Sequence, residues 1–563
     1  MQIYSESLTT YKRLKTKEVK IGDLLLGNFH PIRVQTMTTT DTMDTIATVE
    51  QSIRCIEAGA ELVRITAPSK KEAENLLNIK NELKKRGYTT PLVADIHFTP
   101  NAAEIAARIV EKVRVNPGNY IDKKKFELIE YTDADYAEEI DRIRERFTPL
   151  IKICKEYGTA MRIGTNHGSL SDRIMSRYGD TPMGMVESAM EFLRIARDET
   201  YHNIVLSMKA SNPQVMVQAY RLLTKTMFEE FGECYPLHLG VTEAGDGEDG
   251  RIKSAIGIGT LMEDGLGDTI RVSLTEDPEF EIPVCKDIVK RLPNPSEGGA
   301  LVSYNDKLSY NPFEYKRRET FEVGNIGNKH VPVVVADLSK IEKITHQHLQ
   351  RVGYIYNETT DKWNISDAAA DYIFTANQIL DFELPGTLKV IVYKEAWNKA
   401  ADKTKYFPIF EAKEFLNLLN GSTEKRSALN FVMLETEVPE SSLLNDLEIH
   451  LRDTEVSATV VFCLSTKNKN ALQSVRSLFV ELQNRNIKNP AILITDSNWQ
   501  TADEHLIHFA TETGGLFLDG FGDGICLGMT KKSYDAMSKN LNASGRNYIN
   551  NQSAEQFINN TAF

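Results

Sequence analysis

PIRVQTMT (residues 31–38), TIATVEQSIRCIEAGA (45–60) and ELVRITAP (61–68) are the consecutive segments that decide the fold. The first and third are short runs of β-branched and apolar residues, as in strands that are covered on both faces. The segment between them repeats its apolar residues with the spacing of an amphipathic helix. Two strands joined through a helix predict a βαβ unit, in which the strands run parallel.

The same alternation continues to about residue 290. Six further strand-like segments follow in order: PLVADIHF (91–98), KVRVNPGN (112–119), AMRIGTN (160–166), NIVLSMKAS (203–211), PLHLGVTEAG (236–245) and DTIRVSL (268–274). Eight βα units in about 260 residues have the size and rhythm of a TIM barrel. The main alternative is an open doubly wound sheet, but the first βα turn lacks the GxGxxG of a dinucleotide-binding sheet. We therefore expect an α/β protein with a TIM barrel over residues 1–290.

The composition changes after about residue 291. Residues 292–315 are rich in Pro, Gly, Ser and Asn, which indicates a boundary. Strand-like segments return as VPVVVADLS (331–339), LKVIVYKEAW (388–397), NFVMLETEV (430–438), ATVVFCLST (458–466), AILITDSN (491–498) and GLFLDGFGDGI (515–525). They predict a second α/β domain over 291–525, for which a barrel is one arrangement. It could be a diverged copy of the first, although no clean internal repeat is visible. Its strand ends lack a comparable set of cations, so we expect a structural role. The polar, Asn-rich residues 526–563 are expected to be a connector.

The overall composition restricts the function. The chain of 563 residues has a formal net charge of −13, which argues against a general nucleic-acid or membrane-surface role. No segment approaches the ~18 apolar residues of a membrane helix, and the N-terminus has no apolar signal region. The six cysteines are widely spaced and form no CxxC pair, so a disulfide framework is not expected. These features predict a cytoplasmic enzyme.

Five cations end strand-like segments of the first domain: Arg64, Arg114, Arg162, Lys209 and Arg271. In a TIM barrel the C-terminal ends of the strands meet at one rim, where the active site lies. Arginine offers forked donors that match phosphate oxygens, and lysine offers a point charge. The Gly-rich residues 243–260 run into a helix, whose first N–H groups suit a phosphate. The pattern predicts a site for a polyanionic small molecule, with a diphosphate as the natural candidate.

Other polar residues share these strand ends. They are Gln35, Met37, Asp95, His97, Asn116, Asn166, Thr242, Glu243 and Ser273. Asp95 could simply neutralise an arginine, and His97 could be either a structural histidine or a substrate contact. His167 and His238 are expected to be local hydrogen-bonding groups. Glu243 is a carboxylate among cations, which is where a general acid would be placed.

Several longer motifs follow one another in a fixed order over about 250 residues. They are PIRVQTMTTTDT, PLVADIHF, VRVNPGN, RIGTNHGSL, SMKAS, PLHLGVTEAG, KSAIGIG and GDTIRVSL. Together they closely resemble the IspG family, also called GcpE, of 4-hydroxy-3-methylbut-2-enyl diphosphate synthases. The second domain resembles the insert in the long form of that family.

The resemblance implies a reaction in the methylerythritol phosphate route to isoprenoids. The substrate would be 2-C-methyl-D-erythritol 2,4-cyclodiphosphate, whose ring is opened by two electrons with loss of a hydroxyl as water. A 4Fe–4S cluster would pass the electrons from ferredoxin or flavodoxin. Each residue role is implied by its motif position. Arg64, Arg114, Arg162, Lys209, Arg271 and Ser273 would hold the diphosphate. Asp95 and Asn166 would help to orient the sugar-derived part of the substrate. Thr242 and Glu243 would lie at the reacting end, with Glu243 as candidate proton donor.

The sequence departs from the family in one respect. Members carry a C-terminal cluster domain with a Cys-Pro-x-Cys motif, a third Cys and a Glu as iron ligands, and these 563 residues contain none of those motifs. We expect that the cluster ligands are absent from this chain, that no metal site is present, and that the chain by itself is inactive. It would then be a truncated product, a fragment or a divergent form.

The sequence leaves three alternatives open. The chain could be a barrel transferase of the pterin-binding type, or a barrel that binds the cyclodiphosphate or another phosphorylated ligand without redox activity. A separate chain could also supply the cluster domain. A homodimer is compatible with all of them, whereas nucleic-acid and membrane partners are not expected.

Overall fold

A computed structural model describes residues 4–8, 10–121, 130–292, 308–421, 426–436, 441–469, 471–549 and 552–563. The chain divides into two compact units. One holds residues 11–295 with the first seven residues, and the other holds 296–563 with residues 8–10. Within the described ranges, no helix is both long enough and apolar enough to cross a membrane.

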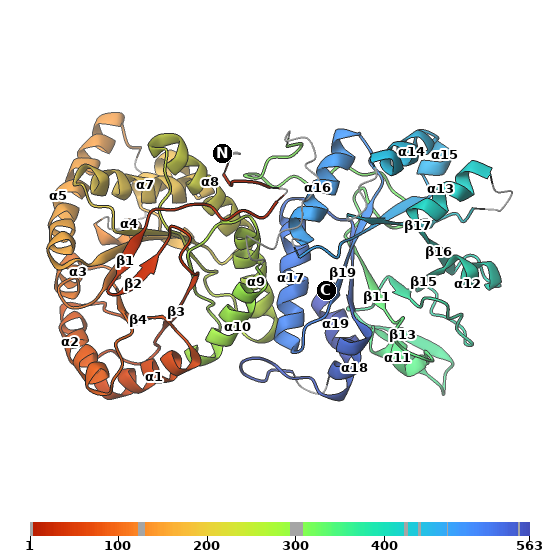
Figure 1. Cartoon of the computed structure of the whole chain (residues 1–563), viewed down its shortest axis with the longest axis horizontal. Coiled ribbons are helices and arrows are strands. Elements are labelled where there is room, and N and C mark those ends of the chain that lie inside the picture. The colour runs from red at the N-terminus through yellow and green to blue at the C-terminus, as the bar shows by residue number, and fades with distance from the viewer. Residues whose placement is uncertain are drawn as a thin grey trace. The chain divides into compact units, whose positions relative to one another are not determined.

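The first unit is built on eight parallel strands, each followed by helical structure (Figure 1). The strands are β3 (Arg33–Met37), β4 (Leu62–Thr66), β5 (Leu92–Asp95), β6 (Lys112–Val115), β7 (Ala160–Asn166), β8 (Ile204–Lys209), β9 (His238–Leu239) and β10 (Thr269–Ile270). They pair in the order β8-β7-β6-β5-β4-β3-β10-β9. A parallel bridge between Leu206 and Leu237 brings β8 back to the β9 edge. The predicted TIM barrel is therefore confirmed.

The principal helices of this unit surround its strands (Figure 1). They are α1 (Thr45–Ala58), α2 (Lys70–Lys85), α3 (Pro100–Ala106), α5 (Asp133–Tyr157), α7 (Pro182–Asp198), α8 (Pro213–Phe231), α9 (Gly247–Glu263) and α10 (Pro278–Lys290). Their starts follow local chemistry: the Asp44 side chain accepts the Ala47 N–H at the start of α1, and Thr181 caps α7 ahead of Pro182. The helices leave the C-terminal strand ends as the place where loops converge.

A short antiparallel hairpin, β1 (Val19–Ile21) with β2 (Leu24–Leu26), precedes the barrel and was not expected from the sequence. Its Val19, Ile21 and Leu26 pack with Leu62, Val93, Ala160 and Val205, which lie near the N-terminal ends of β4, β5, β7 and β8. This apolar cluster closes the end of the barrel opposite the rim.

The second unit is a closed barrel of eight parallel strands. Its strands are β11 (Val333–Asp337), β14 (Tyr372–Phe374), β15 (Lys389–Tyr393), β16 (Tyr406–Glu411), β17 (Asn430–Glu435), β18 (Val460–Ser465), β19 (Ala491–Ser497) and β20 (Gly524–Met529). Its main helices are α13 (Ala412–Gly421), α14 (Ser441–Leu451), α16 (Ala471–Asn484), α17 (Ala502–Leu518), α18 (Lys531–Lys539) and α19 (Ala554–Ala562). The second α/β domain is thus confirmed, with barrel closure as its arrangement.

Three features of this unit differ from the sequence expectation. Strands β14 and β16 were missed, because one is very short and the other contains Pro408. The segment 515–525 is not one strand, since α17 continues to Leu518 and β20 begins at Gly524. The expected boundary after residue 525 therefore falls inside β20. Beyond it, α18 and α19 are folded and α19 packs on β11 and β20, because its buried face includes Phe557 and Ile558.

The two units share a contact pattern around a short motif that both contain. Each contains a DGxGD segment, at 264–268 and at 519–523. Equivalent contacts surround them: Arg13 bonds Asp268 and the His30 carbonyl as Arg317 bonds Asp523 and the His330 carbonyl, and Arg221 pairs with Asp264 as Arg476 pairs with Asp519. The second barrel therefore has the same arginine–aspartate contacts around its DGxGD segment as the first.

The barrel interiors nevertheless differ in chemistry. The second is filled by apolar side chains such as Phe407, Phe431 and Val461. The first buries Lys112, whose ammonium donates to Gln35 Oε1 at 3.0 Å, and also buries Arg162. An interior with buried cations requires compensation that an apolar interior does not. The contrast locates the candidate site in the first barrel.

Candidate functional site

The five predicted cations gather inside the first barrel, where the charges of the four arginines all act on Lys209. Lys209 ends β8 and Arg271 directly follows β10, whereas Arg64, Arg114 and Arg162 are the third residues of β4, β6 and β7 and so lie before the strand ends. Arg64, Arg114, Arg162 and Lys209 are buried, and the Arg271 side chain is only 12% exposed. Strands β6, β7 and β8 are consecutive in the sheet, β5 separates β4 from β6, and Arg114 stands directly opposite Arg162 in the β6–β7 register. The structure therefore brings these predicted residues together.

Asp95 is the carboxylate at the centre of this cluster. Its Oδ1 lies 3.0 Å from Arg114 Nη1, and its Oδ2 lies 3.4 Å from Arg64 Nε and 3.5 Å from His97 Nε2. Burial raises the pKa of Asp95, but the two guanidiniums outweigh burial and hold its pKa well below the usual range. The single negative charge of Asp95 is thus shared among three basic side chains.

The ion pairs of Asp95 are with Arg64, His97 and Arg114, and not with the buried Arg162 or Lys209. The Nε and Nη1 atoms of Arg162 are buried without a hydrogen-bond partner. Burial, together with repulsion from Arg64 and Arg114, lowers the pKa of Arg162 well below its ordinary value. Burial and nearby arginines lower the pKa of Lys209 in the same direction. Uncompensated buried cations are costly, so this arrangement favours an anionic ligand.

Two glycines make room for these long side chains. A Cβ at Gly164 would lie 2.7 Å from Arg114 Nε, and Arg114 Nη2 donates to the Gly164 carbonyl at 2.8 Å. A Cβ at Gly240 would lie 2.8 Å from Lys209 Nζ. Neither position could carry a larger side chain without displacing a cation, so both glycines position the site.

Thr242 and Glu243 lie on the loop after β9, where the Thr242 N–H donates to the carbonyl of Ala210, the residue after Lys209, at 3.0 Å. Glu243 is exposed and has a positive φ of 53°, a conformation that non-glycine residues rarely adopt. The buried Oγ1 of Thr242 has no hydrogen-bond partner.

This loop is tied to the next one. The Thr275 N–H donates to the Gly245 carbonyl at 3.0 Å. The buried ion pair between Arg251 and Glu276, at 2.7 Å, joins the start of α9 to the same loop. The C-terminal part of the loop that carries Glu243 is therefore fixed to the loop after β10.

The remaining predicted residues surround the cluster. His97 is the most exposed group on Asp95, Asn166 ends β7 opposite Lys209, and Ser273 follows β10, partly exposed. Asn116 caps the short helix α4 (Pro117–Tyr120) and donates to Ser169 Oγ at 2.8 Å. Among the hydrogen bonds and ion pairs of the described ranges, none joins the Glu243 or Ser273 side chain to the cations.

Sequence reasoning missed Glu281, whereas the expected role of His238 as a local hydrogen-bonding group agrees with the contact of its Nδ1 with Thr269 Oγ1 at 3.4 Å. Glu281 is 2% exposed on α10 and its Oε2 lies 3.8 Å from Arg271 Nη2. His238 is fully buried below the arginines, and burial followed by their charges lowers its pKa well below the usual value. Glu281 does not end a strand segment, so no local pattern marked it.

The cysteines do not form a metal site in the structure. All six are buried, and burial raises the pKa of Cys55 to about 11 and of Cys154, Cys234 and Cys285 to about 12. In the part of the chain that the structure describes, no group of three or more His, Cys, Asp or Glu side chains could hold a metal ion.

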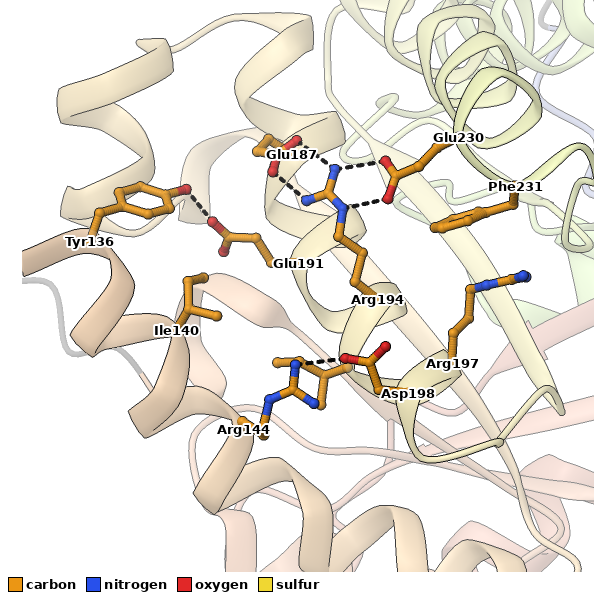
Figure 2. A pocket seen from close by; sticks show the side chains of 11 residues that line it. Tyr136, Ile140, Arg144, Glu187, Glu191, Arg194, Arg197, Asp198, Glu230 and Phe231 are labelled. Carbon is orange, nitrogen blue, oxygen red and sulfur yellow. Dashed lines mark hydrogen bonds and ion pairs between the residues drawn. The ribbon is translucent and has the colours of Figure 1, made fainter. Parts of the chain in front are cut away.

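A pocket of about 420 Å³ lies elsewhere in this unit, between α5, α7 and α8 (Figure 2). Figure 2 shows Arg194 forked between Glu187 and Glu230, and Arg144 paired with Asp198. Because its charges are paired within the protein, this pocket lacks the excess of one sign that marks the rim.

Known proteins resemble the chain over most of its length. Residues 16–286 match the GcpE TIM-barrel domain. The 4-hydroxy-3-methylbut-2-en-1-yl diphosphate synthase (flavodoxin) of Parabacteroides distasonis is 45% identical over 518 residues, covering 92% of this chain and 79% of that protein. The corresponding Leptospira interrogans enzyme is 42% identical, covering 94% and 80%. The chloroplastic enzyme (ferredoxin) of Arabidopsis thaliana is 42% identical, covering 95% and 74%. Identity of this extent shows that the chain belongs to the GcpE family of 4-hydroxy-3-methylbut-2-en-1-yl diphosphate synthases.

Proposed function

We propose that the rim of the first barrel binds 2-C-methyl-D-erythritol 2,4-cyclodiphosphate for reductive ring opening to 4-hydroxy-3-methylbut-2-enyl diphosphate. The observation that carries the proposal is the excess of buried positive charge, above all Arg162 with two guanidinium nitrogens unpartnered. A diphosphate supplies several acceptor oxygens and negative charge, which match forked arginine donors. The apolar interior of the second barrel offers no such match.

The proposed roles follow position. The five cations and Ser273 hold the two phosphates, with Asp95 keeping Arg64 and Arg114 oriented. Asp95 and Asn166 also help to orient the sugar-derived part of the substrate, and His97 is a further substrate contact.

Glu243 is the proposed proton donor. Loss of a hydroxyl as water requires a proton on the leaving oxygen, which a positioned carboxylic acid can supply. The positive φ of Glu243 and the tethered loop around it support this role, because strained backbone accumulates at functional sites. Thr242, adjacent and with an unpartnered hydroxyl, would contact the same end of the substrate.

The family uses a 4Fe–4S cluster, through which the two electrons would pass from the electron donor to the substrate. The cysteines of this chain do not fit the cluster, because they are buried, widely separated in sequence and raised in pKa, whereas clusters are held by thiolates. We propose that its ligands come from outside these 563 residues. Purified anaerobically, the chain should lack stoichiometric iron; about four irons per chain with absorbance near ~400 nm would contradict this.

The relatives' names specify flavodoxin or ferredoxin, so we propose one of these as electron donor. The homodimer and the cytoplasmic location stay predictions, which light scattering and cell fractionation would test.

Ligand binding tests the proposed function directly. The cyclodiphosphate should bind the isolated chain in calorimetry and raise the melting temperature of the first barrel, since a ligand that binds only the folded state stabilises it. Inorganic sulfate at the same concentration is the control for nonspecific anion binding. Equal shifts with sulfate and cyclodiphosphate would refute a specific diphosphate site. Binding without turnover, even with an added reductant, would favour the binding-only alternative.

A further inference from the structure

Glu281 is a buried carboxylate directly behind the cation cluster. It lies on α10, and its Oε1 accepts the Leu274 N–H at 2.8 Å. Its Oε2 is buried, has no hydrogen-bond partner and faces Arg271 Nη2 at 3.8 Å. The Nε of Arg271 is likewise buried without a partner. One carboxylate oxygen of Glu281 therefore accepts a hydrogen bond from the loop after β10, and the other faces Arg271 without a hydrogen bond.

This ion pair is more open than two other buried pairs of the same barrel. Arg221 and Asp264 approach to 2.8 Å, and Arg173 and Glu191 to 2.5 Å. Those distances are within hydrogen-bonding range, whereas 3.8 Å is not. Arg271 is thus close enough for electrostatic attraction to the Glu281 carboxylate, but its N–H donors stay available for another anion.

The charges around Glu281 come from several elements. Burial is the largest effect and raises the pKa of Glu281 to about 7. Three cations act against burial and lower this pKa: Arg271 on the loop after β10, Lys209 on β8 and Arg64 on β4. The nearby thiols, Cys285 on the same helix and Cys55 on α1, have pKa values raised to about 12 and about 11, so both stay neutral. Glu281 is the carboxyl behind the site that can change charge near neutral pH.

We propose that Glu281 is a positioning residue that takes up a proton when the cyclodiphosphate binds and so releases Arg271 to the phosphates. The inference rests on the proposed function. A bound diphosphate attracts the donors of Arg271 and adds negative charge, and both effects favour the neutral carboxyl. The proton comes from solvent and adds to Oε2, while Oε1 keeps its bond to Leu274.

Calorimetry in buffers of different ionisation enthalpy measures this proton. Each phosphorus of the ligand carries one strongly acidic oxygen, so the ligand itself does not titrate near neutral pH. We expect about half a proton taken up per ligand at about pH 7.5, and nearly none at about pH 5.5, where Glu281 is already protonated. Affinity should fall as pH rises through about 7, because the raised pKa makes binding strongest where the carboxyl is neutral.

Variants separate Glu281 from Lys209, the other group that can gain a proton. Glu281→Gln should remove most of the uptake and flatten the pH dependence of affinity. Lys209→Arg should bind more weakly but keep the uptake. Glu191→Gln, a matched loss of a buried carboxylate in a closed pair, should keep it as well.

The outcomes are decisive for the inference. Binding without uptake in the unsubstituted chain, or unchanged uptake in Glu281→Gln, overturns it. If Glu281→Gln does not fold, Lys209→Arg decides, since uptake retained there supports Glu281 and uptake lost there assigns the proton to Lys209. Absence of binding at any pH overturns the proposed function, and the inference with it.

Discussion

Two fully buried arginines of the first barrel should respond oppositely to the same substitution. Arg162 and Arg221 are each 1% exposed. Arg162 stands among other cations with Nε and Nη1 unpartnered, whereas Arg221 donates to Asp264 through Nε at 3.0 Å and Nη2 at 2.8 Å. Methionine keeps the apolar volume of the stem and removes the charge.

Arg162→Met should stabilise the ligand-free barrel by about 1–3 kcal/mol, because an uncompensated buried ion is replaced by an apolar side chain. Arg221→Met should destabilise it by about 3–5 kcal/mol, because it leaves Asp264 buried without its cation. The first change should also weaken cyclodiphosphate binding by about 2 kcal/mol, roughly 30-fold, as expected for lost charge-assisted hydrogen bonds. The second should leave affinity unchanged.

Thermal unfolding and calorimetric titration of the two variants measure both effects. The melting temperature should rise for Arg162→Met and fall for Arg221→Met, by a few degrees for each kcal/mol. If Arg162→Met melts as low as Arg221→Met, Arg162 is a structural residue. If it binds the ligand with unchanged affinity, Arg162 is not part of the site.

Three further predictions concern the same rim. Gly164→Ala should displace Arg114 and weaken cyclodiphosphate binding about tenfold, since its Cβ would meet Arg114 Nε at 2.7 Å; unchanged affinity in calorimetry would show that Arg114 is not needed where it lies. Asp95→Asn should destabilise the barrel at pH 7. Because the pKa of Asp95 is depressed in the folded state, its stabilisation is present above about pH 4 and is lost as pH falls through the folded-state pKa. The melting temperatures of the unsubstituted chain and of Asp95→Asn should therefore converge in acid. A difference in melting temperature that stays constant with pH would show that the ionised carboxylate is not the stabilising group. Glu243→Gln should keep ligand affinity but lose most of kcat when a relative's cluster domain is fused after Phe563; near-normal kcat would reject its role as proton donor.

Much of the architecture could be predicted because it repeats locally. Each βα unit of the first barrel is recognisable as an apolar run followed by an amphipathic helix. The ends of those runs identified five cations: Arg64, Arg114, Arg162, Lys209 and Arg271. Where the local signal is weak, prediction was wrong. Strand β14 has only three residues, and β20 begins after a glycine-rich turn that resembles a strand end.

The sequence by itself determined the barrel class, the family and the gathering of five cations at one rim, because parallel strands bring their C-terminal ends together whatever lies between them. Only the tertiary structure decided how those charges are compensated. Asp95 pairs with Arg64 and Arg114, two buried nitrogens of Arg162 have no hydrogen-bond partner, and Glu281 faces Arg271 from a helix with no strand-end motif. Pairing distance and burial depend on side chains far apart in the chain, and these two quantities, rather than residue type, decide whether a charge is neutralised within the protein or left for a ligand.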